Sequence, residues 1–303
     1  MNAKQFEFLR HILKQYSGIA LSADKQELME LRVEKLLKEQ RISSVAELCE
    51  ALSRQDGESL RWRLAELMAI QETYFFRDKT VFSCFTDTIL PALIERRAST
   101  RHLRIWCAAA ATGQEPYSIA MALAEMRAKL TGWKVDILAT DFSEEALMKA
   151  RSGVYRQFEV QRGLPVTLLL KYFGRNGNDW EIRPEIRQAV SFRQQNLLHN
   201  SMRHGMFDLI FCRNVMIYFD QETRAEVLGR LTQQLSNDGF LVLGATETVR
   251  GMSEELGPLP TPCPGVYQHL PYQTGMGEEE LGYLGPEPQG RLMRRPAVKR
   301  RYI

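Results

Sequence analysis

Residues 103–121 read LRIWCAAAATGQEPYSIAM, and this stretch decides the fold. An apolar run over 103–109 gives way to a turn of small residues around Gly113. Pro116 then suits the first turn of a helix, and the helical pattern continues over 117–130. A buried strand, a tight turn and a helix in this order are typical of a parallel α/β sheet.

The same alternation continues along the chain. Further apolar runs at 135–139, 190–193, 207–212 and 240–244 alternate with helical patterns at 144–151 and 223–235. Fully apolar strands indicate a mostly parallel sheet that helices cover on both faces. The rhythm breaks over 152–192, where residues 180–183 follow an Asn-Gly-Asn turn and predict a small extra hairpin. Residues 265–270 predict a last edge strand.

The two ends of the chain differ from this pattern. Residues 1–85 contain no convincing strand, and their apolar spacing predicts about four helices, the first ending at Gly18. Residues 271–303 are rich in Gly and Pro and end in a basic cluster, which predicts a disordered basic tail. We therefore expect a helical domain over 1–85, a sheet domain over 86–270 with a β-subdomain at about 170–192, and the tail. The tail is either a solvated end or a docking segment for an acidic partner.

Composition excludes several classes of protein. The chain has 303 residues, of which 44% are hydrophobic and 25% charged, as in an ordinary globular protein. A formal net charge of +3 is too small to indicate nucleic-acid binding. No apolar run approaches the ~18 residues of a membrane span, and no signal-peptide pattern begins the chain, so we expect no membrane insertion.

The cysteines favour a reducing compartment, which we take to be the cytoplasm. There are five, an odd number, and none lies in a C-x-x-C pair. This pattern suggests neither a disulfide framework nor a zinc site, and the scattered histidines add no metal motif. Cys107 and Cys212 fall in apolar runs, so we expect both to be buried strand residues.

Candidate site residues follow the predicted strands, because parallel sheets bind ligands at the carboxyl ends of their strands. The small-residue turn at 110–116 lets a ligand approach the backbone, or it serves only tight strand–helix packing. It lacks the G-x-G-x-x-G pattern, which argues against a nicotinamide dehydrogenase. Asp141 ends the second run and is placed either to accept hydrogen bonds from a ribose or to cap the next helix beside Ser143.

Polar residues also follow the third and fourth runs. Asn196 is placed to meet an adenine edge, or it is a turn residue. Asn214 can donate and accept towards a ligand amine or amide. Tyr218 is a further candidate, although tyrosine side chains more often serve packing than catalysis. Asp220 is expected to cap the helix that follows it.

These turns, together with TYFFRD at 73–78, ATD at 139–141, NL at 196–197 and FDLIFCRNVMIYFD at 207–220, resemble one family. The sequence resembles CheR, the bacterial chemotaxis receptor methyltransferases, over about residues 5–270. The EPYSIAM run at 115–121 and the 207–220 run are highly specific, and both occur in the family's order.

The resemblance implies an α/β fold: a class I methyltransferase with a Rossmann-like, mostly parallel sheet, an N-terminal all-α domain and a small β-subdomain insertion. It implies S-adenosyl-L-methionine as cofactor and S-adenosyl-L-homocysteine as product. The family's cofactor contacts correspond here to Gln71, Thr73, Arg77, Glu115, Asp141, Asn196, Leu197, Asn214 and Val215. Gln71 stands where the family usually has Asn, and Cys107 and Gln114 depart from the usual Ser and Glu.

The implied activity is methyl transfer to glutamates on the cytoplasmic signalling coiled coil of chemoreceptors. Separately, we expect a monomer. A glutamate is ionised at neutral pH, so orientation and desolvation rather than a general base are required. Arg77 is the candidate to hold the acceptor carboxylate, or else the cofactor carboxylate, and Tyr218 is a further candidate contact with the substrate.

Two departures concern the partner. The stretch 174–179 is short, which is typical of members that do not depend on a receptor's C-terminal pentapeptide. Residues 24–41 carry five basic and five acidic side chains, so Arg32, Lys35 and Lys38 form either a basic stripe or part of a mixed solvated face.

Two other functions remain open: a class I methyltransferase acting on another acceptor, and a non-enzymatic adaptor that keeps the fold. Intact Glu115, Asp141 and Asn214 argue against the adaptor, which has no need of them.

Overall fold

The first part of the chain is helical. The computed structural model describes residues 1–199, 205–259 and 263–270; the predicted tail, 271–303, lies outside them. Four helices come first: α1 (Ala3–Ser17), α2 (Gln26–Gln40), α3 (Val45–Ser53) and α4 (Glu58–Met68). Their apolar faces meet in a core of their own, and Gly18 ends α1 with a left-handed φ of 75°. The four predicted helices are therefore confirmed.

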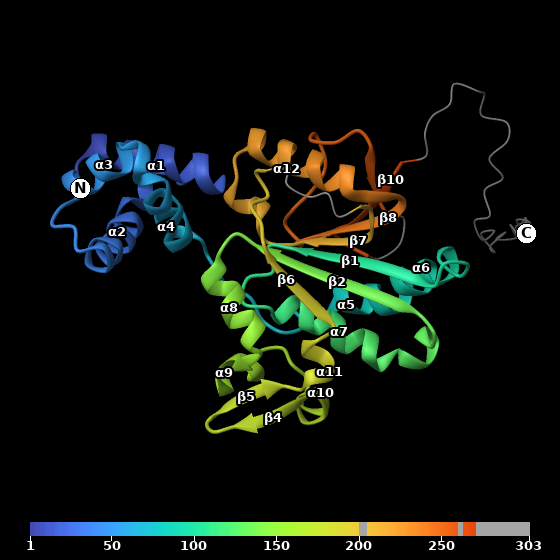
Figure 1. Cartoon of the computed structure of the whole chain (residues 1–303). Helices are drawn as coiled ribbons and strands as arrows, with labels where there is room; N and C mark the ends of the chain where they lie inside the picture. The colour runs from blue at the N-terminus through green and yellow to red at the C-terminus, as the bar shows by residue number, and fades with distance from the viewer. Residues whose placement is uncertain (200–204, 260–262, 271–303) are drawn as a thin grey trace, which may run out of the picture. The chain divides into compact units, whose positions relative to one another are not determined.

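A seven-stranded sheet follows the helical part (Figure 1). Its strand order is β6-β2-β1-β7-β8-β10-β9. The strands are β1 (His102–Ala108), β2 (Lys134–Asp141), β6 (Val190–Gln194), β7 (Phe207–Cys212), β8 (Leu235–Leu243), β9 (Leu256–Pro258) and β10 (Val266–His269). The first five are mutually parallel, and β9 and β10 are antiparallel additions.

The order of the strands indicates where a ligand would bind. Chain order runs from β1 outward to β2 and β6 on one side, and then returns to β7 and β8 on the other. The carboxyl ends of β1, β2 and β7 therefore lie at a topological switch point, where open parallel sheets bind ligands.

Helices cover both faces of the sheet. Each buried strand points its apolar side chains alternately to the two faces, so both faces have to be covered. Ile105 and Cys107 of β1 belong to the core cluster that includes residues of α5, α6 and α7, whereas Trp106 and Ala108 belong to the cluster that includes α12. The helices are α5 (Lys79–Cys84), α6 (Leu90–Arg96), α7 (Gln114–Glu125), α8 (Glu144–Ser152) and α12 (Gln221–Gln234). A π-helical turn, Phe85–Ile89, joins α5 to α6, and short 3₁₀ turns lie at Ala23–Lys25, Gln55–Gly57, Arg127–Leu130 and Met216–Tyr218.

The predicted hairpin is confirmed. Strands β4 (Phe173–Asn176) and β5 (Asp179–Ile182) pair around Gly177, whose φ is 59°. A third strand that the sequence did not reveal, β3 (Val154–Tyr155), joins them, and helices α9 (Gln157–Gln161), α10 (Val166–Tyr172) and α11 (Pro184–Arg187) accompany the small sheet. The small sheet thus draws on residues before the expected 170–192.

One strand prediction is wrong in part. Residues 266–269 do form a strand, but it is not the sheet edge, because β9 pairs with its outer side. The three residues of β9 are too short to produce an alternating pattern, so no sequence signal indicates them.

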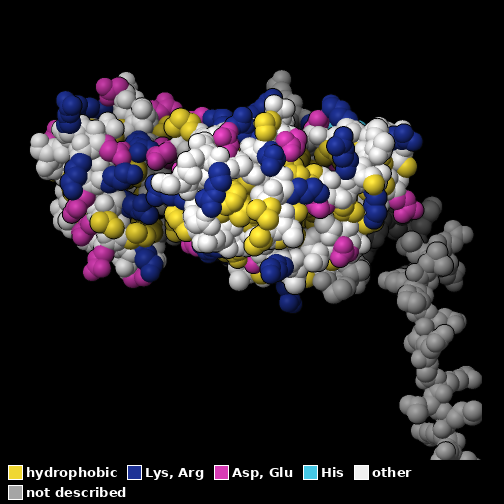
Figure 2. Space-filling view, turned by 90° about the horizontal axis from the view of Figure 1, so that it is seen from below, with side chains coloured by type: hydrophobic (Ala, Val, Ile, Leu, Met, Phe, Trp, Pro, Cys, Tyr) yellow, Lys and Arg dark blue, Asp and Glu magenta, His cyan; other side chains and the backbone are white. Residues whose placement is uncertain are grey.

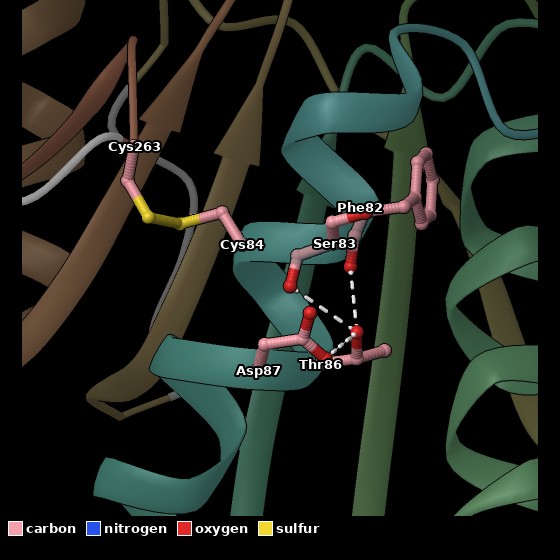
Figure 3. The surroundings of a disulfide bond; sticks show 6 residues. All are labelled: Phe82, Ser83, Cys84, Thr86, Asp87 and Cys263. Atoms are coloured by element: carbon pink, nitrogen blue, oxygen red, sulfur yellow. Dashed lines mark hydrogen bonds between the residues drawn. A yellow bond between two sulfur atoms is a disulfide. The ribbon is translucent and has the colours of Figure 1, made fainter.

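A disulfide joins Cys84 at the end of α5 to Cys263 before β10 (Figure 3). The two Cα atoms lie 5.6 Å apart, within the range that a disulfide requires. This corrects the expectation that the chain has no disulfide. The pair is separated by 179 residues, so only the fold brings it together and spacing could not reveal it. Cys107 and Cys212 are free and buried in strands, as predicted.

The surface carries charges of both signs. On the face seen in Figure 2, Lys and Arg alternate with Asp and Glu over the N-terminal helices, without a patch of one sign. Apolar side chains gather in the middle of the same view. Phe158, Val166 and Leu170 are the large apolar residues of α9 and α10 that are well exposed. Among the described residues, no helix combines the length and the apolar character that crossing a membrane requires.

Candidate active site

A pocket opens at the switch point of the sheet. It encloses about 900 Å³ of empty space, open solvent at its mouth included. The loops after β1, β2, β6 and β7 line it, together with the segment 69–77 and, from the N-terminal helical part, Ser17 and Ile19. Two backbone contacts attach that helical part beside the pocket, because Ala20 N donates to Tyr218 O at 2.9 Å and Ile19 forms a bridge with Phe219.

The loop after β1 forms one wall. Ala109 and Ala111 adopt left-handed backbone angles, with φ of 62° and 48°. Gly113 has a φ of 94°, and a Cβ on it would lie 2.8 Å from the Cβ of Ala150. The turn is therefore tight against α8 and keeps small side chains towards the pocket. Gly113 therefore serves tight packing, as one interpretation of the turn expects, while Ala109 and Ala111 line the pocket.

Asp141 ends β2 at the floor of the pocket and is 5% exposed. Its two carboxylate oxygens accept hydrogen bonds from Ala111 N at 2.7 Å and Ser143 N at 2.9 Å. Burial raises the pKa of Asp141 above its ordinary value, against the opposing effect of these N–H groups. Ser143 itself caps α8, so Asp141 does not cap the helix directly. Oδ2 keeps a lone pair for a ligand, while Oδ1 is also approached by Gln71 Nε2 in a long contact of 3.5 Å.

A buried ion network crosses the opposite wall. Arg213, with a side chain only 1% exposed, contacts Glu115 at 2.8 Å and Asp78 at 2.6 Å. Its Nη2 also donates to the carbonyl of Arg77 at 3.0 Å. Burial raises the pKa of the Glu115 carboxyl, while the Arg213 guanidinium opposes this rise. The network fixes the segment around Arg77 against helix α7.

Arg77 is the second arginine of the pocket lining, and it is less committed. Its guanidinium donates to Glu72 O at 3.1 Å and lies 5.6 Å from the centre of the Tyr74 ring. Neither contact is with a carboxylate, so Arg77 can bind an anion. Tyr218 faces the same pocket, where its hydroxyl can donate a hydrogen bond, and burial raises the pKa of this hydroxyl.

The remaining predicted residues complete the lining. Asn196 donates through Nδ2 to Tyr16 O at 2.7 Å and accepts from Leu198 N at 3.0 Å, so its side chain is bonded as a turn residue's would be. Gln71 Nε2 approaches Asp141 Oδ1 at 3.5 Å. Asn214 has a φ of 58°, and its buried Oδ1 has no hydrogen-bond partner among the described residues. As predicted, Asp220 caps α12 through Thr223 N.

The pocket brings together all ten residues predicted for the site. They are Gln71, Thr73, Arg77, Glu115, Asp141, Asn196, Leu197, Asn214, Val215 and Tyr218. Sequence reasoning missed Ser17, Ile19 and Phe142 in the lining, and Glu247 directly behind it. Glu247 follows strand β8, so the rule that polar residues after strands form sites would have found it. Ser17 and Ile19 carry no such signal, because the fold alone brings the N-terminal part to the sheet.

This topology and this pocket define a class I methyltransferase with an added helical domain. The profile of the "CheR methyltransferase, SAM binding domain" matches residues 71–262, and that of the "CheR methyltransferase, all-alpha domain" matches residues 4–69. The chain belongs to the CheR methyltransferase family.

Curated relatives agree with this assignment. Chemotaxis protein methyltransferase 1 of Pseudomonas aeruginosa is 39% identical over 253 residues, covering 82% of this chain and 92% of the relative. Chemotaxis protein methyltransferase Cher2 of Pseudomonas putida is 38% identical with the same coverage. Chemotaxis protein methyltransferase of Vibrio parahaemolyticus is 34% identical, covering 83% and 92%.

The residues present fit S-adenosylmethionine, the family's cofactor. The unpartnered, buried Oδ1 of Asn214 can accept from an amino group, and the carboxylate of Asp141 can accept from ribose hydroxyls. Phe142 and Leu197 provide apolar surface for a base. An amide oxygen for the amino group, a carboxylate for the ribose and an apolar surface for the base match the chemistry of this molecule.

Proposed function

We propose that this enzyme methylates glutamate side chains on the cytoplasmic signalling coiled coil of chemoreceptors. The products would be glutamate methyl esters and S-adenosyl-L-homocysteine. The observation that carries the proposal concerns the two arginines of the described pocket lining. Arg213 is paired with two carboxylates, whereas the Arg77 guanidinium contacts no carboxylate. The names of the relatives support a chemotaxis substrate.

When bound, S-adenosylmethionine supplies an electrophilic methyl group. A glutamate acceptor has a reference pKa near ~4.3 and is already a nucleophile at neutral pH, so a general base is unnecessary. We assign Arg77 the task of orienting the acceptor carboxylate, because its contacts leave N–H groups free for an anion. Tyr218 is proposed to donate a further hydrogen bond to the substrate.

The N-terminal helical part is proposed to exclude water. Ser17, Ile19, Ala69 and Ile70 lie in the pocket lining, and Lys14 pairs with Asp220 at 2.6 Å beside them. Enclosure of this kind can supply much of the ~7–11 kcal/mol available from orienting two reactants. The proposed cofactor contacts are Gln71, Thr73, Arg77, Glu115, Asp141, Asn196, Leu197, Asn214 and Val215.

The short β4–β5 connection supports independence from a pentapeptide tether. Asn176 pairs with Asp179, so only two residues form the turn, which offers little surface for capturing a peptide. We further propose that the enzyme works in the cytoplasm as a monomer whose catalytic part ends at residue 270. The boundary between the helical part and the catalytic part is proposed to lie before α5, rather than at the expected residue 85. Val81, Phe82 and Cys84 pack in the core of the sheet, which favours grouping α5 with the catalytic part.

The proposal is tested with methyl-labelled S-adenosylmethionine and receptor-bearing membranes. Mild base treatment of the product should release the label as volatile methanol, as a carboxyl methyl ester requires. Label that resists base would mean another acceptor atom and a different methyltransferase activity. No transfer combined with tight cofactor binding would mean another acceptor, and no cofactor binding would favour the adaptor function.

A further inference from the structure

Glu247 lies behind the pocket and is 8% exposed. Its carboxylate accepts hydrogen bonds from four backbone N–H groups. Oε2 accepts from Asn214 N at 2.8 Å and Gly244 N at 2.7 Å. Oε1 accepts from Val215 N at 3.0 Å and Met216 N at 2.8 Å. One side chain thus joins the loops that follow the neighbouring strands β7 and β8.

This arrangement is close-packed and lacks a counter-charge. Among the described residues, none forms a salt bridge with Glu247, so the four N–H dipoles alone stabilise its charge. A Cβ on Gly244 would lie 2.7 Å from Glu247 Oε2 and 2.9 Å from Asn214 N. A larger residue at 244 would therefore push the carboxylate away from the loop.

The loop that Glu247 binds carries Asn214, which lines the pocket. Asn214 has a left-handed φ of 58°, a conformation that Asn adopts more readily than most non-glycine residues and that persists where the surroundings hold it. The N–H groups of residues 214–216 all donate to the Glu247 carboxylate, and these hydrogen bonds hold Asn214 in the left-handed conformation. The result is that Asn214, with its unpartnered Oδ1, is part of the pocket lining.

We propose that Glu247 is a positioning residue for cofactor binding: it holds the 214–216 turn so that Asn214 presents its side-chain oxygen to the cofactor. The proposal rests on the proposed function only in taking the pocket as the S-adenosylmethionine site. Glu247 itself does not line the pocket, so it acts through Asn214 rather than on the substrate.

The test is the Glu247→Gln variant, which keeps the shape but turns one acceptor into an NH₂ group facing N–H donors. We expect the calorimetric Kd for S-adenosylmethionine to rise about tenfold or more, corresponding to ~1.4 kcal/mol. The KM for the receptor should stay within about twofold. Amide exchange in peptides covering 214–216 should accelerate, while peptides from the far end of the sheet stay protected.

Asp208 provides a matched control. It is a buried carboxylate at the opposite end of β7, where it binds Arg97 Nε at 2.7 Å and Arg104 N at 2.8 Å. Asp208→Asn should lower the melting temperature and leave the cofactor Kd within about twofold. A purely structural role for Glu247 would make the two variants behave alike, with lowered melting and unchanged Kd, and would overturn the inference.

A second variant keeps the test decisive if Glu247→Gln does not fold. Glu247→Asp keeps the charge but shortens the side chain by one methylene, which withdraws the carboxylate from the N–H groups of residues 214–216. A tenfold weaker cofactor Kd in that variant supports the inference, and an unchanged Kd overturns it. Failure of the wild-type protein to bind cofactor would instead contradict the proposed function, so the two ideas fail separately.

Discussion

Asp141→Asn should weaken cofactor binding far more than it weakens the fold. Asp141 has about four acceptor positions, and Ala111 N at 2.7 Å and Ser143 N at 2.9 Å occupy two of them. A third position meets Gln71 Nε2 in a long contact of 3.5 Å that a ribose hydroxyl can displace, and the fourth is free. In the Asn variant, the side-chain NH₂ would face one of the backbone N–H donors and could not accept a hydrogen bond. Only the single carbonyl oxygen would still accept hydrogen bonds. Losing one hydrogen bond to a charged acceptor and weakening a second costs about 3 kcal/mol, or roughly a hundredfold in Kd.

The stability of the cofactor-free protein should respond differently. Burial raises the pKa of Asp141, so the folded state binds this proton more tightly than the unfolded state does. The resulting stabilisation is present below the unfolded pKa and is lost as pH rises through the folded value. At neutral pH, removal of the buried charge therefore offsets part of the lost backbone hydrogen bonding, and the melting temperature should change little.

Isothermal titration calorimetry measures the Kd for S-adenosylmethionine. Thermal unfolding without the cofactor measures stability, so the two effects of Asp141→Asn can be separated. Asp136→Asn is the control, because Asp136 lies on the same strand away from the pocket and pairs with His102 and Lys134. An Asp141→Asn Kd within threefold of the wild-type and Asp136→Asn values would refute the ribose role.

Other contacts lead to three more expected outcomes. Arg77→Ala should lower kcat/KM for receptor methylation by roughly a hundredfold, since it removes a charge-assisted bond worth ~1.5–3 kcal/mol; an equal collapse in thermal unfolding would identify Arg77 as structural. Cys263→Ser opens a loop spanning 179 residues and should lower the free energy of unfolding by about 3–5 kcal/mol, as should reductant on the wild type; unchanged melting in both would contradict the disulfide's role. The Lys14 ammonium lowers the pKa of Asp220 to about 2, so this group stabilises the fold above its unfolded pKa and the gain is lost as pH falls through about 2. Asp220→Asn keeps the helix cap but should flatten the acid limb of the stability–pH curve modestly, because the pair is partly exposed, and superimposable curves would contradict this.

The sequence predicts the parts of this protein that depend on local patterns. The strand at 207–212 is fully buried, so its apolar run defines its ends, and Gly18 and Asp220 mark helix ends through local chemistry. The rule that ligands meet the carboxyl ends of strands is enough to predict that Asp141 and Asn214 share one pocket, and both do line it.

Contacts between distant segments could not be predicted in this way. Three features join segments far apart in the sequence: the Cys84–Cys263 bond, the approach of Ser17 to the pocket, and the hydrogen bonds from the N–H groups of residues 214–216 to Glu247. No spacing encodes such contacts, because they depend on how the completed sheet arranges its loops.

Glutamate methylation is tested most directly by peptide mapping of a chemoreceptor cytoplasmic fragment, using tandem mass spectrometry after incubation with the enzyme and S-adenosylmethionine. We expect a mass gain of one methylene on glutamate side chains of the coiled coil, which disappears after mild base and falls sharply with Arg77→Ala. Tight cofactor binding with no modified glutamate, or a methyl group on another residue type, would contradict the proposed activity.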